Sequence, residues 1–170
     1  MDEHTPKYLN MAEDLCREMP SAFDNEPDRR RAFEKIFVPL DEKLDQHIEF
    51  SLEAKVSTAK ETGDRPDVAK TVKYNGGNLV LLLEEFKMES DGDVYMQICR
   101  AYEVLCTDKK NKHLLKFGNP VFLLCVLGPY LMVCGAIYHE NAHIEPLTPL
   151  LPMFPEIGIE GRPAKIAHCL

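Results

Sequence analysis

The strongest constraint on the fold is an Asn-Gly-Gly tripeptide at 75–77, set between two β-prone segments. Asn and Gly readily adopt the positive φ angles that a tight chain reversal needs. The flanking segments, about 66–74 and 78–87, are strand-like, and the second is a largely apolar run with charges only at its end. The sequence therefore predicts a β-hairpin.

The loop length decides which side chains meet at the open end of this hairpin. A three-residue loop closed by Tyr74 and Asn78 places Asp67 directly opposite Glu85. Glu85 and Lys87 are two residues apart on one strand, so they project from the same face. This register gathers two carboxylates and one ammonium group, a layout that suits a hard divalent cation beside a general base.

Other readings of the same residues remain open. A two-residue loop moves Asp67 opposite Glu84 or Phe86, and a charged strand end is often only a solvated terminus. In a regular strand Glu84 points to the face opposite Glu85. A β-bulge at this position would exchange the roles of the two glutamates.

A further helix adds to the pattern. The order is Pro66-Asp67, then Glu85-x-Lys87 at a strand end, then a helix carrying Gln97 about ten residues later. This order resembles the PD-(D/E)XK nuclease superfamily.

The resemblance is closer to the version of that domain in fungal and oomycete Crinkler-type effectors and related fungal proteins, where it usually precedes a protein-kinase-like domain. The segments Gly128-Pro129-Tyr130, Gly135-Ala136 and 145–149 look like the same group. The resemblance covers roughly residues 60–150 and implies a restriction-endonuclease-like core.

The resemblance also implies roles for individual side chains. Asp67 and Glu85 would ligate Mg²⁺ or Mn²⁺ together with the carbonyl oxygen of Phe86, since hard cations prefer oxygen ligands. Lys87 would orient or deprotonate the attacking water. Beside two carboxylates Lys87 should stay protonated, which favours the orienting role. Gln97 would reach towards Lys87 or the water, or else is a polar residue on an exposed helix face.

Further candidates lie outside the hairpin. The first core helix of the superfamily often bears an acid near the metal, which makes Glu34 a candidate, although the interpretation as a plain surface glutamate is favoured. Basic residues that would contact DNA fall in two segments, a polar loop at 53–64 and a basic stretch at 108–116. They are Lys55, Lys60, Lys109, Lys110 and Lys112.

The formal net charge of −8 counts against simple nucleic-acid binding, which draws most of its affinity from basic side chains. It favours an alternative, a non-catalytic module of the same fold that docks a kinase-like domain or a host protein, or forms a homodimer. The six cysteines include no Cys-x-x-Cys pair and are predicted to be reduced thiols. We therefore expect an intracellular, reducing location, in a host nucleus or cytoplasm if the protein is an effector.

The fold class predicted is α/β (α+β), with a mixed sheet, in one domain over 1–150 and a proline-containing tail or linker over 151–170. Cys125 and Cys134 could face one another across a hairpin. The apolar run 121–138 is better explained by two buried strands around a turn than by a membrane span.

The remaining helices and strands are predicted from the spacing of apolar residues and from residues that begin or end helices. A helix is expected over 6–18, and a second begins near Arg29 with Asp28 as its cap and Pro39 as a kink or end. A first strand is expected within 46–52. The last elements expected are a helix at roughly 92–107, a loop at 108–116 and strands at 120–127 and 130–139.

Overall fold

The computed structural model describes residues 5–45, 50–51, 66–74, 77–88, 92–112, 115, 118–154 and 162–169. Its helices are α1 (Thr5–Glu18), α2 (Glu26–Asp45), α3 (Val94–Thr107) and α4 (Arg162–Cys169), with a 3₁₀ turn η1 (Lys109–Asn111). Its strands are β1 (Phe50–Ser51), β2 (Val68–Tyr74), β3 (Gly77–Lys87), β4 (Val121–Leu127), β5 (Tyr130–His139), β6 (Asn141–Pro146) and β7 (Leu151–Pro152).

The strands form one mixed sheet in the order β1-β2-β3-β4-β5-β6, with β7 added alongside β5. Only β3 and β4 run parallel among the paired strands described. Parallel neighbours need a crossover connection, and α3 supplies it between β3 and β4. The predicted α/β (α+β) class with a mixed sheet is confirmed at this level.

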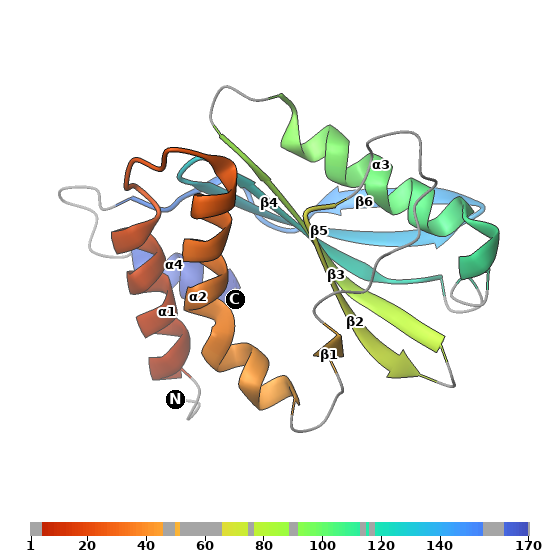
Figure 1. Ribbon diagram of the computed structural model, residues 1–170, viewed down its shortest axis with the longest axis horizontal. Helices are drawn as coiled ribbons and strands as arrows, with labels where there is room; N and C mark the ends of the chain where they lie inside the picture. Colours follow the sequence, from red (N-terminus) through yellow and green to blue (C-terminus); the bar gives the residue numbers. More distant parts are fainter. Residues whose placement is uncertain are drawn as a thin grey trace.

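Helices cover both faces of the sheet (Figure 1). On one face α1, α2 and α4 enclose a core that contains Leu15, Phe33, Phe86 and Ile166. On the other face α3 packs against β3 and β4 around a second core that includes Tyr102. Because neighbouring residues of a strand point to opposite faces, β3 supplies side chains to both cores.

The α3 helix forms as predicted. Its buried side chains are Val94, Ile98, Ala101, Tyr102, Leu105 and Cys106. Asp93 caps the helix by accepting a hydrogen bond from the Met96 amide at 3.1 Å. The Tyr102 hydroxyl donates to the Asn119 carbonyl oxygen at 2.9 Å, so this tyrosine is a core residue.

The N-terminal helices differ in detail from expectation. The 6–18 helix is confirmed as α1, but the cap of α2 is Asn25 rather than Asp28, whose amide donates to Asn25 Oδ1 at 2.9 Å. Asp28 therefore lies inside the first turn. The helix does not end at Pro39 but continues to Asp45, and Figure 1 shows its axis changing direction in the second half.

The hairpin register departs from expectation near the turn and agrees with it near the open end. Tyr74 pairs with Gly77, not Asn78, so the predicted three-residue loop is wrong. The ladder then shifts between Lys70 and Thr71, because β3 carries one extra residue there, Leu81. This β-bulge compensates for the shorter loop.

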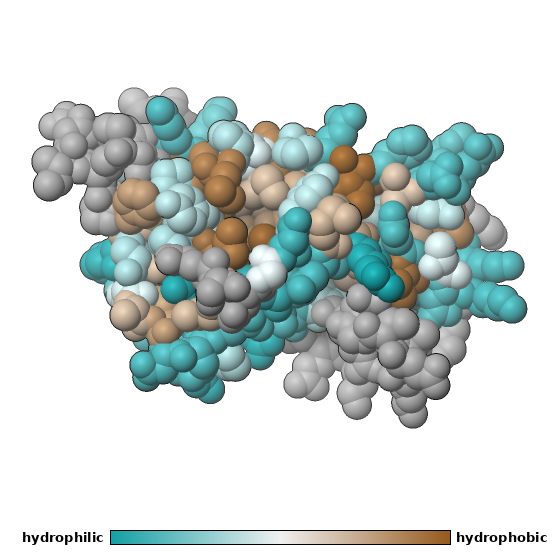
Figure 2. All heavy atoms as spheres, turned by 90° about the horizontal axis from the view of Figure 1, so that it is seen from above, coloured by the Kyte–Doolittle hydropathy of each residue, from teal (hydrophilic) through white to brown (hydrophobic). Residues whose placement is uncertain are grey.

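The apolar run at 121–138 forms β4 and β5 around a turn, as expected. Among the described residues no helix is both long and apolar enough to cross a bilayer. Cys125 pairs with Met132 and Cys134 with Leu123, so the two thiols are diagonal neighbours on one face, both free. Figure 2 shows hydrophobic side chains in several separate groups on one surface, with hydrophilic ones between and around them.

The segment after residue 150 is integrated into the domain, which the prediction of a tail or linker did not anticipate. The β7 strand pairs with β5, and the Met153 side chain is fully buried. The α4 helix packs against α1 and contributes Ile166 to the core. Pro163 is compatible with this helix because it lies in the first turn, where the amide needs no partner.

Candidate functional site

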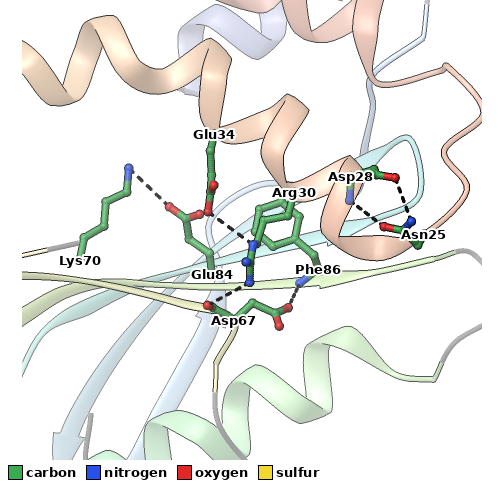
Figure 3. A network of polar contacts seen from close by, with 8 residues as sticks. All are labelled: Asn25, Asp28, Arg30, Glu34, Asp67, Lys70, Glu84 and Phe86. Carbon is green, nitrogen blue, oxygen red and sulfur yellow. Dashed lines mark hydrogen bonds and ion pairs between the residues drawn. The ribbon is translucent and has the colours of Figure 1, made fainter. Parts of the chain in front are cut away.

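Asp67 lies immediately before β2 and bridges to β3. Val68 pairs with Glu84, so the next position along the ladder sets Asp67 level with Glu85, as predicted. Asp67 Oδ2 accepts a hydrogen bond from the Phe86 amide at 2.7 Å (Figure 3). The carboxylate is thereby fixed against the strand that carries the other two candidates.

Glu85 and Lys87 project from the same face of β3, towards the side that α3 covers. Lys87 Nζ lies 3.1 Å from Glu85 Oε1. Glu85 is only 4% exposed, and Cys125 lies beside it on β4. The structure thus brings Asp67, Glu85 and Lys87 together at the ends of two neighbouring strands.

Burial and neighbouring charges shift the pKa values of two residues in this cluster. Burial, together with the negative charge of Asp67, raises the pKa of Glu85 to about 7, although contacts with Lys87 and the Asp67 backbone oppose the rise. Burial disfavours the ammonium of Lys87, but Glu85, Asp67 and Glu26 outweigh that effect and raise its pKa. Lys87 is therefore protonated at neutral pH, which supports an orienting role over that of a base.

A fourth residue of the cluster, Glu26, was missed by the sequence analysis. It is the first residue of α2, and its Oε2 lies 3.3 Å from Lys87 Nζ. No sequence spacing points to it, because the two residues are 61 positions apart. The only available signal was its place at the start of a helix, where acids are common.

The other face of β3 carries a polar network beneath α2, which Arg30 joins to the Asp67 carbonyl oxygen at 3.5 Å (Figure 3). Glu84 is 3% exposed and lies 3.6 Å from Lys70 Nζ. Because the bulge lies upstream of Glu84, it leaves the two glutamates on the faces predicted for a regular strand.

Glu34 also lies on the α2 side, where it pairs with Arg30 at 3.6 Å. Figure 3 shows its carboxylate beside Arg30 and Glu84, and it is not among the acids that act on Glu85 or Lys87. The acid that the first long helix over the sheet contributes to the Asp67–Glu85–Lys87 cluster is Glu26 instead.

The other predicted residues are not gathered at the cluster. Gln97 is exposed on α3, with its amide nitrogen beside Gly92. Lys109 and Lys112 are exposed at the far end of α3, about 20 Å away along a 14-residue helix. Lys110 lies in η1, and Lys55 and Lys60 fall outside the described residues.

Comparison with known proteins adds no relative: no family model, curated protein or solved structure matches this chain.

The donor set suits a hard divalent cation. The Glu85 carboxylate is buried next to that of Asp67, and a cation between them would relieve the repulsion that raises the pKa of Glu85. Two carboxylates, with waters completing the shell, are typical of Mg²⁺ sites in proteins. Among the described residues no three His, Cys, Asp or Glu side chains are grouped as metal ligands, so the protein would supply few ligands.

Proposed function

We propose that this chain is a metal-dependent nuclease-like domain, with a restriction-endonuclease-like core, that binds and cleaves DNA. The observation that supports it is the convergence of Asp67, Glu85 and Lys87 on one face at the ends of β2 and β3. Asp67 and Glu85 would hold Mg²⁺ or Mn²⁺. The cation would supply a polarised water and stabilise charge on the scissile phosphate.

Each side chain of the cluster would have a different role in the reaction. The amide of Phe86 fixes Asp67, so the carboxylate stays in place when a cation or phosphate approaches. Lys87 stays protonated beside its acids and can donate hydrogen bonds to water or phosphate oxygen. The backbone at Lys87 is fixed too, since its carbonyl accepts the Gly128 amide at 2.9 Å.

Cleavage of supercoiled plasmid DNA with Mg²⁺ or Mn²⁺ tests this proposal. We expect nicking by the wild type, loss in Lys87→Ala and Asp67→Ala, and none in EDTA. Lys165→Ala, which removes an exposed lysine on α4 that has no role in the proposal, is the matched control and should keep most of the activity. Cleavage that survives both site variants would refute the assignment.

A second candidate function is a non-catalytic module of the same fold, which docks a kinase-like domain or a host protein or pairs with itself. One observation favours it: Phe122, Ile137 and Leu147 are 57%, 49% and 58% exposed. All three lie on the side of the sheet that α1 and α2 cover only in part, with Leu147 over Gly135. If the wild type neither cuts DNA nor gains thermal stability with Mn²⁺, this function takes precedence.

A further inference from the structure

Lys87 lies between two carboxylates that come from different parts of the fold. Its Nζ is 3.1 Å from Glu85 on the same strand and 3.3 Å from Glu26 on α2. The Lys87 side chain is 15% exposed, that of Glu85 5% and that of Glu26 29%. Glu26 is thus the outer partner of the ammonium group and Glu85 the inner one.

The start of α2 is held firmly where Glu26 contacts the cluster. Asn25 caps the helix directly before Glu26. One turn later Arg30 Nη1 approaches the Asp67 carbonyl oxygen at 3.5 Å. Residues four apart share one helix face, so a single face of α2 reaches both strands of the site.

A cation bound by Asp67 and Glu85 would compete with Lys87 for the Glu85 carboxylate. If Glu85 were the sole partner of Lys87, cation binding would leave a largely buried ammonium without a counter-charge, which is costly. The contact with Glu26 removes that cost, because Lys87 keeps one carboxylate when Glu85 turns away.

We infer that Glu26 is a positioning residue that retains Lys87 when Glu85 is taken by a divalent cation. This inference rests on the proposed function. It assigns Glu26 no direct contact with the cation. Its action goes through Lys87, so it should vanish when Lys87 carries no charge.

A double-mutant cycle on Mn²⁺ affinity tests the inference without any activity assay. Binding is measured by titration calorimetry with MnCl₂ at pH 8 for wild type, Glu26→Gln, Lys87→Met and the double variant. We expect Glu26→Gln to weaken Mn²⁺ binding about tenfold, and to change it less than twofold in the Lys87→Met background.

Two further variants sharpen the result. Glu26→Asp keeps the charge but withdraws the carboxylate by one methylene, and it should weaken binding nearly as much as Glu26→Gln. Glu13→Gln removes an exposed acid from α1 and should leave the affinity unchanged. Thermal unfolding of each variant checks that the fold is intact.

The measured Mn²⁺ affinities can overturn the inference alone or the inference together with the proposed function. Equal weakening by Glu26→Gln with and without Lys87 would make Glu26 a ligand or a simple charge, and would overturn the inference. No weakening in either background would overturn it too, while the proposed function stands. Failure of the wild type to bind Mn²⁺ would overturn both.

Discussion

Replacement of Glu85 by Gln should stabilise the metal-free protein at alkaline pH. The folded state raises the pKa of Glu85 from 4.5 to about 7, so it binds this proton more tightly than the unfolded state does. The stability contributed by Glu85 is therefore complete below pH 4.5 and is lost as the pH rises through 7. At 1.36 kcal/mol per pKa unit, the ionised side chain costs the fold about 3 kcal/mol at pH 8.

Glutamine mimics the protonated side chain and avoids this cost. We expect Glu85→Gln to raise the free energy of unfolding by up to about 3 kcal/mol at pH 8, and by much less at pH 5. For a domain of this size the gain at pH 8 corresponds to roughly 6–12 °C in Tm. Denaturant unfolding in EDTA at both pH values measures it.

The control is Glu145→Gln, which neutralises an exposed acid on β6 and should change stability by less than about 0.5 kcal/mol at either pH. Two results would contradict the reasoning: a Glu85→Gln protein no more stable than wild type at pH 8, or a gain of the same size at pH 5. Either would mean that burial and Asp67 do not oppose the charge on Glu85.

Three further predictions concern the fold. Deletion of one leucine from the run at 81–83 removes the bulge and keeps every other β2–β3 pair, so the protein should fold and retain Mn²⁺ binding. Deletion of Phe86 instead moves Lys87 to the opposite face of β3 and should abolish Mn²⁺ binding. Tyr102→Phe leaves the buried Asn119 carbonyl without its hydroxyl donor and should cost about 1–3 kcal/mol in denaturant unfolding. Ile166→Ala should cost about 2–5 kcal/mol in the same assay if α4 belongs to the domain core, and almost nothing if it is a detached tail.

The sequence predicted the site's register although it mispredicted the turn. The predicted three-residue loop has one residue more than the observed turn. The observed β3 strand has one extra residue, Leu81, at its bulge, so the pairing beyond the bulge is the same in both cases. Both therefore bring Asp67 level with Glu85. Alternation along a strand then fixes the faces of Glu85 and Lys87, which is why these local relations were recoverable.

Contacts between segments far apart in the chain could not be predicted from the sequence. Glu26 meets Lys87 only because α2 packs across the sheet at the end of β3, and no local period encodes that placement. The α4 helix was missed because Pro163 reads as a breaker unless it lies in a first turn. Glu34 was a candidate only through the resemblance, and its position along α2 directs it to Arg30.

The two adjacent glutamates of β3 show why the α3 side, rather than the α2 side, is the better place for a cation. Both are almost fully buried, and each has a lysine within 3.6 Å. Glu84 lies 3.6 Å from Lys70 Nζ and makes further contacts on the α2 side. Around Glu85 one lysine is shared by three acids, since Asp67 and Glu26 also act on it. Buried acids in excess of their bases favour added positive charge, and a cation or a proton on Glu85 can supply it. A proton at low pH and a divalent cation at high pH should therefore exclude one another, so Mn²⁺ binding near neutral pH should release protons.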